Sequence, residues 1–220
     1  SSGGPFSVSM NYVAHLFLAE PYDEHRIGSL LADFTNGPID TLRQRFGDGI
    51  ARGIAHHRRI DRFTDQHASV RACVDALNGH FGIYAGIVVD VVFDHFLLRH
   101  FEAFSQNSEA AFFDAIYASI ADIRPAFPER YRTAVQRMLE RRWLSGYREL
   151  DMVAYALKRM DERFSRPTPL RDAHGGILDA YDVLESGFLD FFPQVLHFSR
   201  TIDDSVFSGG HGHIDSNLAV

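Results

Sequence analysis

Cysteine and lysine are almost absent from this sequence of 220 residues, and each absence excludes something. The single cysteine, Cys73, rules out an internal disulfide bond and indicates a reducing compartment, so we expect a cytoplasmic protein. We interpret Cys73 as a small core residue rather than a catalytic thiol. Because Lys158 is the only lysine, arginine carries nearly all the positive charge, and its planar guanidinium group suits carboxylate and phosphate recognition.

The sequence also lacks a net positive charge and an uninterrupted apolar segment that could span a membrane. The formal net charge of −7 argues against a general nucleic-acid-binding protein. The most apolar run, residues 83–101, is long enough to span a bilayer, but it carries Asp90, Asp94 and His95 in its middle. A charge at that depth costs about 2.5–3.5 kcal/mol of insertion free energy, so we predict a buried helix of a soluble protein and no membrane association.

Helical periodicity dominates the chain, and no repeat or low-complexity linker divides it. The predicted helices are residues 11–19, 27–34, 50–65, 70–78, 83–101, 108–123, 128–144, 149–163 and 170–191. We therefore predict one all-α domain of about eight to nine helices over residues 10–200. Residues 1–9 (SSGGPFSVS) lack the basic region and apolar core of a secretory signal, and we expect a vector-derived or disordered leader there. Residues 201–220 have no periodicity and are expected to form an irregular tail.

Two ionisable residues continue an apolar stripe in the segment HHRRIDRFTD, residues 56–65. Ile50, Ile54, His57 and Asp61 follow one another in steps of four and three, so they share one face of a helix. The two isoleucines mark this face as buried. We therefore expect His57 and Asp61 to point inward, while the neighbouring arginines point to solvent or to the rim of a cleft.

Three aspartates have an equally unexpected apolar context. Asp90 and Asp94 are four residues apart on a helix that is apolar on every side, and Asp33 lies within the apolar segment LLADF. Burying an unpaired carboxylate is costly, and two carboxylates spaced in this way repel each other. A cation must therefore compensate them, and the candidates are an arginine, a protonated histidine such as His95, or a divalent metal ion.

A shared divalent ion would account for these acids and for the inward histidine together. The proposed ligands are Asp33, His57, Asp61 and Asp94. One imidazole and three carboxylates form a hard, oxygen-rich set that favours Mn²⁺, or Mg²⁺, over a structural zinc ion. The alternative is a buried salt-bridge network with Arg58, Arg59 or Arg99, and spacing alone leaves both interpretations open.

Positive charge concentrates between residues 129 and 148, against the negative total. This segment contains six arginines and two acidic residues, a local balance of +4. Either it is a solvated helix face, or it recognises an acidic partner; the sequence favours neither.

Several motifs in the same order resemble the acyl carrier protein phosphodiesterase family, over roughly residues 10–200. They are MNYVAHL (10–16), LLADF (30–34), the GI…HRRID…TD segment (53–65), D…DHFL…RH (90–100), W…YR (143–148) and FFP (191–193). The resemblance implies removal of the 4′-phosphopantetheine arm from holo-acyl carrier protein, an acidic protein substrate, to give apo-carrier. It also implies Mn²⁺ dependence, a cytoplasmic setting and a helical fold distantly similar to HD-type phosphohydrolases. The chain departs from the HD pattern, because its only contiguous pair is the reversed Asp94-His95.

Roles for individual residues follow from this chemistry. A divalent ion would polarise a phosphoryl oxygen and lower the pKa of a water molecule. His95 or Asp90 would orient or deprotonate that water, and His15 would protonate the leaving serine oxygen. Arg58 would neutralise charge that develops on the phosphate. For His15 the alternative is a core histidine that bonds a backbone carbonyl.

Two other functions remain compatible with the sequence. The first is an HD-like phosphohydrolase that acts on nucleotides such as guanosine tetraphosphate, which would need a base-binding pocket. The second is a non-catalytic helical module that binds acidic partners, in which the buried aspartates would pair with arginines and no metal would bind. The oligomeric state is not predicted.

Overall fold

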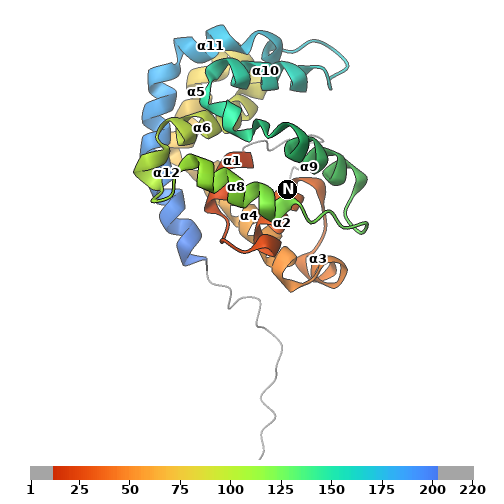
Figure 1. Cartoon of the computed structure of the whole chain (residues 1–220). Coiled ribbons are helices and arrows are strands. Elements are labelled where there is room, and N and C mark those ends of the chain that lie inside the picture. The colour runs from red at the N-terminus through yellow and green to blue at the C-terminus, as the bar shows by residue number, and fades with distance from the viewer. Residues whose placement is uncertain (1–11, 203–220) are drawn as a thin grey trace, which may run out of the picture.

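The computed structural model describes residues 12–202, which fold into twelve α-helices and four 3₁₀ turns without a strand (Figure 1). The elements are α1 (Tyr12–Leu18), α2 (Asp23–Leu31), η1 (Ala32–Phe34), α3 (Ile39–Phe46), α4 (Asp48–Gln66), α5 (Ala68–Phe81), η2 (Gly82–Tyr84), α6 (Ala85–Arg99), α7 (Phe101–Phe104), α8 (Glu109–Ile120), α9 (Glu129–Arg141), η3 (Trp143–Arg148), α10 (Leu150–Asp161), η4 (Pro169–Asp172), α11 (Ala173–Asp179) and α12 (Tyr181–Thr201). The all-α prediction is confirmed. The predicted leader and nearly all of the predicted tail lie outside the described residues.

The predicted number of eight to nine helices is too small for the described part of the chain. Two short helices, α3 and α7, were not predicted, and the segment expected as one helix over 170–191 is divided. It consists of η4, α11 and then α12, which begins after Ala180 and continues through Pro193 to Thr201. Pro193 lacks an N–H group, yet Phe191, Phe192 and Val195 around it are buried. Burial of this face outweighs the missing hydrogen bond.

The apolar helix α6 forms the centre of the core. Its side chains from Val88 to Leu98 are almost all buried, and it packs against α1, α5, α10 and α12. The helical stretch Ala68–Arg99, which includes α6, is the one segment among the described residues that is long and apolar enough to cross a membrane. In its most apolar window 67% is buried inside the protein, as is typical of a core helix.

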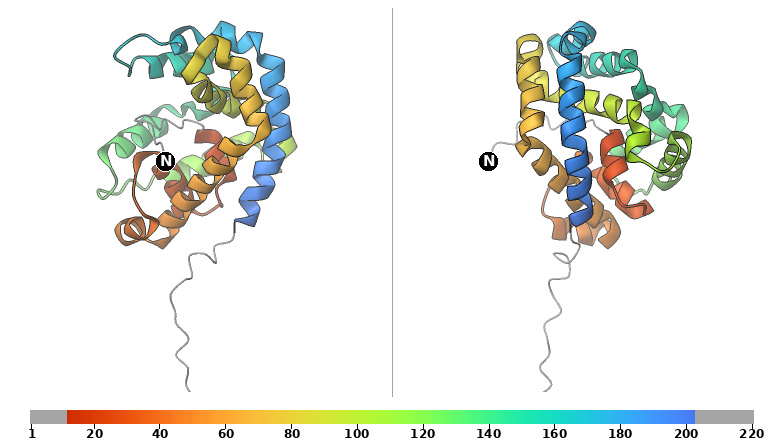
Figure 2. Two further views of the ribbon diagram at one scale, coloured as in Figure 1. Left: turned by 180° about the vertical axis from the view of Figure 1, so that it is seen from behind. Right: turned by 90° about the vertical axis from the view of Figure 1, so that its left-hand side faces the viewer.

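Helices α2 and α4 cross at backbone contact, and two glycines permit this. A Cβ atom on Gly28 would lie 2.1 Å from the carbonyl oxygen of Ile50, and one on Gly53 would lie 2.2 Å from that of His25. The close crossing places η1, which directly follows α2, beside the middle of α4. On the other side of α4 runs the long helix α12, which also covers α5 and α6 (Figure 2).

Candidate metal centre

Two histidines and one aspartate, from α1 and α4, converge on one another in the structure. The rings of His15 and His57 stack with their centroids 3.7 Å apart and their planes 15° from parallel. Both Nε2 atoms face the carboxylate of Asp61, at 3.0 Å for His15 and 3.2 Å for His57. One potential ligand atom from each residue lies within 4.8 Å of the others, which is the spacing of a metal site.

Asp33 of η1 closes this group from a third side. Its Oδ1 lies 3.4 Å from Nε2 of His57, and its side chain is nearly buried. Asp33 is held there because η1 follows α2 without a break and α2 contacts α4 through the glycine crossing. Three of the four predicted ligands, Asp33, His57 and Asp61, are therefore neighbours in the structure.

The apolar stripe of α4 explains the depth of the site. Ile50 and Ile54 are fully buried, and His57 continues them into the interior with 3% of its surface exposed. The side chain of Asp61, one turn later, is 39% exposed. The centre is thus buried on its histidine side and open to solvent on its Asp61 side, so a substrate can reach it.

Burial and the contacts within the group shift the pKa values of His57, His15 and Asp61. Burial opposes the charged form of His57, but the contacts with Asp33 and Asp61 outweigh it and raise the pKa of His57 to about 10. Burial and the neighbouring His57 lower the pKa of His15, which is therefore a neutral imidazole. Burial opposes ionisation of Asp61 as well, yet the two histidines hold its pKa well below the usual range.

Several nitrogens of the stacked pair lack hydrogen-bond partners. Both ring nitrogens of His15 and Nδ1 of His57 are buried without a hydrogen bond within residues 12–202. Nε2 of His15 is close to Asp61 but is not aligned with it as a hydrogen bond requires. Buried polar atoms are normally paired, so these nitrogens indicate a missing partner. A divalent cation fits, because neutral imidazole and carboxylate are its ligands.

Asp94, the fourth predicted ligand, binds the backbone of α1 instead of joining the other three. Its two carboxylate oxygens accept hydrogen bonds from the first free backbone N–H groups of α1, those of Val13 (3.0 Å) and Ala14 (2.7 Å). Burial nevertheless raises the pKa of Asp94 to about 8. Asp94 therefore caps the N-terminus of α1 and fixes the helix that carries His15, and it is not part of the converging group.

Asp90 remains beside the centre as a further carboxyl group. Burial raises its pKa well above the usual value, and the nearby carboxylates of Asp61 and Asp65 add to the shift. Asp65 itself has a raised pKa from burial and from Asp61. Asp90 makes no hydrogen bond or ion pair within the described residues, so it is available for proton transfer at this site.

His95, predicted as an alternative base, points away from the centre. Its Nδ1 donates to the carbonyl oxygen of Tyr147 at 3.0 Å, and its Nε2 accepts from the hydroxyl group of Tyr181 at 2.8 Å. Burial lowers its pKa. Both ring nitrogens are used, so the geometry favours a structural role that joins α6 to η3 and α12.

Arg58 lies at the edge of the site and organises the loop after η1. Its guanidinium group donates to the carbonyl oxygens of Gly37 (2.8 Å) and Thr35 (3.4 Å). Burial lowers the pKa of Arg58, and the nearby Asp61 opposes that shift. A phosphate held by a cation beside Asp61 would therefore lie within the field of this guanidinium.

His15 is a candidate metal ligand in the structure but was not predicted as one from the sequence. It was predicted as a proton donor, whereas the structure stacks it on His57. His15 lies in the apolar segment YVAHLFL, and its partners are more than forty residues away along the chain. No local pattern could have indicated them.

The predicted basic segment, residues 129–148, forms α9 and η3. Two of its arginines are paired within the protein: Arg142 with Asp114 and Arg148 with Glu109. The local excess is therefore partly neutralised.

This all-helical domain is that of a hydrolase that acts on phosphodiester bonds, as the comparisons with known proteins show. The profile of the acyl carrier protein phosphodiesterase family matches residues 10–195. Acyl carrier protein phosphodiesterases of Salmonella paratyphi A, Enterobacter sp. (strain 638) and Salmonella enteritidis PT4 are each 35% identical over 188 residues, which is 85% of this chain and 96% of theirs. The chain belongs to the acyl carrier protein phosphodiesterase family. No solved structure matches it.

Proposed function

We propose that this protein is a metal-dependent phosphodiesterase that hydrolyses 4′-phosphopantetheine from holo-acyl carrier protein. The products are apo-carrier with a free serine and 4′-phosphopantetheine. The observation that carries the proposal is the group of His15, His57 and Asp61, with buried nitrogens that lack partners, in a chain of this family. The lone cysteine, Cys73, supports a reducing, cytoplasmic setting for the reaction.

His15, His57 and Asp61 would hold one divalent ion, with Asp33 as a fourth ligand on the side of His57. Two imidazoles and two carboxylates suit Mn²⁺, and Mg²⁺ would bind more weakly because it prefers oxygen ligands. When bound, the ion supplies Lewis-acid chemistry to a phosphoryl oxygen and lowers the pKa of a water molecule.

The chain's own residues then bind, orient and exchange protons. Arg58 lies beside Asp61 and would neutralise negative charge on the phosphate diester. Asp90 lies near the same carboxylates, and its raised pKa suits proton exchange with water or with the leaving serine oxygen. We now assign His15 to metal binding, because a neutral imidazole with a low pKa is a good ligand and a poor acid.

Mass spectrometry of the carrier tests the proposed function. Holo-carrier incubated with the protein and Mn²⁺ should lose the mass of the 4′-phosphopantetheine group, and the free arm should appear with its phosphate attached. Excess chelator should stop the reaction, and added Mn²⁺ should restore it. An unchanged carrier mass, or turnover that persists in chelator, would show that the proposal is wrong.

A further inference from the structure

A small cavity lies against His15, beside the candidate metal centre. Its volume is about 10 Å³, which is enough for about one water molecule. Residues of α1, α4, α6 and α12 line it, and most of them are apolar, including Ile60, Phe93 and Phe191. Among the described residues that line the cavity, only His15 and Thr64 bring polar side chains to it.

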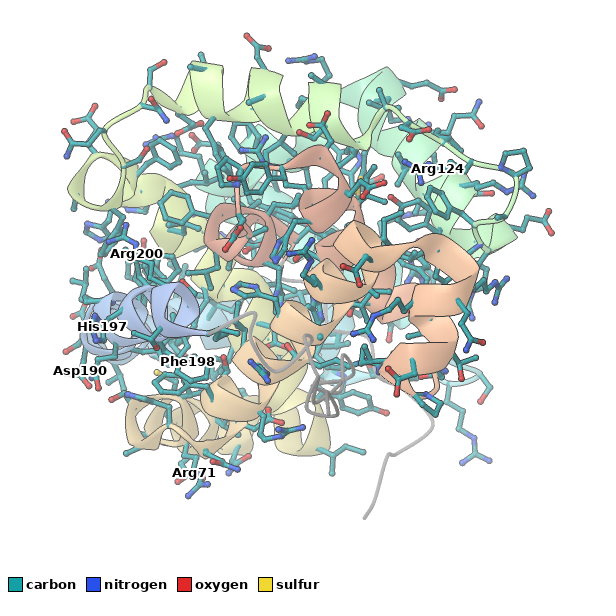
Figure 3. The ribbon with its side chains drawn as sticks, turned by 90° about the horizontal axis from the view of Figure 1, so that it is seen from below. Arg71, Arg124, Asp190, His197, Phe198 and Arg200 are labelled. Atoms are coloured by element: carbon teal, nitrogen blue, oxygen red, sulfur yellow. The ribbon has the colours of Figure 1, made fainter. Side chains whose placement is uncertain are left out.

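Helix α12 supplies one wall of this cavity, and contacts with two neighbouring helices hold that wall in place. Phe198 of α12 stacks on Phe63 of α4 with centroids 4.5 Å apart and planes 14° from parallel. Figure 3 shows Phe198 on the side of α12 that faces α4 and α5. Asp190 of α12 accepts a hydrogen bond from the hydroxyl group of Ser69 on α5. The cavity is therefore enclosed by firmly packed helices.

Thr64 lies on the face of α4 that carries the metal centre. It follows Asp61 by three residues and His57 by seven, and these spacings place all three side chains on one side of the helix. Its hydroxyl group donates to the carbonyl oxygen of Ile60 at 2.9 Å. That bond uses the one proton of the hydroxyl group, so the oxygen can still accept a hydrogen bond.

His15 needs an acceptor at its second ring nitrogen. Its Nε2 lies 3.0 Å from the carboxylate of Asp61 and is the atom that would bind the divalent ion. A neutral imidazole that binds a metal ion through Nε2 carries its proton on Nδ1. Nδ1 of His15 is buried without a hydrogen bond within residues 12–202. In metal sites this second nitrogen almost always donates to a carboxylate, a backbone carbonyl or a water molecule.

We propose that Thr64 positions His15 for metal binding through one water molecule held in this cavity. The water accepts a hydrogen bond from Nδ1 of His15 and donates one to Oγ1 of Thr64. This arrangement keeps the proton on Nδ1 and leaves the lone pair of Nε2 for the ion beside Asp61. Thr64 touches neither the ion nor the substrate, so it acts through His15. The inference rests on the metal binding that the proposed function includes.

Two substitutions at Thr64 and one control test this role. Thr64→Val keeps the branched shape and removes the hydroxyl group, whereas Thr64→Ser keeps the hydroxyl group and removes a methyl group. Thr201→Val is the matched control, because the hydroxyl group of Thr201 also donates to a carbonyl of its own helix, that of Phe198 at 2.8 Å. Thr201 does not line the cavity.

The affinity for Mn²⁺ is the first readout, measured by titrating the metal-free protein and following the electron paramagnetic resonance signal of the free ion. Thr64→Val should weaken binding by about tenfold, as is typical when the partner of a metal ligand is lost. Thr64→Ser and Thr201→Val should stay close to the parent. Equal affinity in Thr64→Val and the parent, or equal losses in the two Thr64 variants, would overturn the proposal, because the hydroxyl group would then have no part in it.

A high-resolution crystal structure of the Mn²⁺-loaded protein gives a second readout that does not depend on hydrolysis. It should show one water molecule bonded to both Nδ1 of His15 and Oγ1 of Thr64, and Thr64→Val should lose it. A dry cavity, or a direct bond from Nδ1 to a backbone carbonyl, would contradict the role of Thr64.

These outcomes also separate this inference from the proposed function. If the parent binds Mn²⁺ and holds this water but leaves holo-carrier intact, the proposed hydrolysis is wrong and the role of Thr64 stands. If the parent cleaves holo-carrier while the cavity is dry, the role of Thr64 is wrong and the function stands. A parent that binds no Mn²⁺ would overturn both.

Discussion

Asp61 is the residue on which the site depends most, because its two oxygens face both histidines. Asp65 has the same side chain four residues later but contacts neither ring, so the pair provides a matched comparison. Asp61→Ala should abolish activity at any practical Mn²⁺ concentration, since a direct ligand is lost. Asp65→Ala should lose about 10–100-fold and recover as Mn²⁺ is raised, as expected for an outer carboxylate. If Asp61→Ala is rescued as readily as Asp65→Ala, the assignment of Asp61 as a ligand is wrong.

His95 should behave as a structural residue. Replacing it with Gln leaves the Tyr147 carbonyl group or the Tyr181 hydroxyl group without a well-placed partner, and an unsatisfied buried group costs about 1–3 kcal/mol. We therefore expect a lower free energy of unfolding with unchanged Mn²⁺ affinity, and Tyr181→Phe should show a smaller loss. Chemical denaturation and metal titration measure the two quantities. A His95→Gln variant that is stable but inactive would restore His95 as the catalytic base.

The candidate site could be predicted from the sequence only where the information is local. The stripe Ile50, Ile54, His57 and Asp61 lies within one helix, and its inward direction follows from helical spacing alone. The hydrogen bonds of Asp94 go to residues eighty positions away, so its capping role has no sequence pattern.

At the scale of helices, α1 is a short element of seven residues that carries a histidine of the site. Its start is held by Asp94 of α6, so Asp94→Ala should release α1 and displace His15. Asp94→Asn keeps one acceptor oxygen and should preserve Mn²⁺ affinity within about tenfold, although it loses about 1–2 kcal/mol of stability because the amide nitrogen cannot accept the second backbone hydrogen bond. Thermal unfolding with Mn²⁺ titration checks both variants. Complete loss of Mn²⁺ binding in Asp94→Asn would instead identify Asp94 as a direct ligand, as the sequence predicted.

The α2–α4 crossing should be intolerant of any side chain at Gly53. Alanine there would place Cβ 2.2 Å from the carbonyl oxygen of His25, so the helices must separate. We expect Gly53→Ala to destabilise the protein by about 1–3 kcal/mol or more and to weaken Mn²⁺ binding, because Asp33 moves away from His57. Gly79→Ala in α5 is the control: its Cβ would meet open space, and it should stabilise by about 0.5–1 kcal/mol. Equal melting temperatures for the two variants would contradict this account of the crossing.

Most helices could be predicted because their periodicity is strong, but their boundaries and the connections between them could not. The division at Ala180 and the passage of α12 through Pro193 depend on what these segments pack against. Helix α3 is short and mostly polar, and it is held by contact with α4 rather than by its own pattern.

For the whole molecule, the metal-free protein should lose stability as the pH rises from about 7 to about 9. The folded pKa of His57 is raised from 6.5 to about 10, and that of Asp94 from 3.8 to about 8, so the folded state binds more protons than the unfolded state in this interval. Stability that these protons provide is lost as the pH rises. Melting temperatures in chelator should therefore fall with pH, and less steeply in His57→Gln. A melting temperature that rises over this interval would contradict the assignment.

The central claim is that one divalent ion, bound by His15, His57 and Asp61, turns this helical domain into a phosphodiesterase. The most direct measurement is a Mn²⁺ titration of the metal-free protein, in which bound metal and hydrolysis of holo-carrier are followed together. We predict that both rise in proportion and saturate at one ion per chain, and that His57→Ala shows neither. Full hydrolysis before Mn²⁺ is added, or binding of one Mn²⁺ by His57→Ala with the affinity of the parent, would contradict the account.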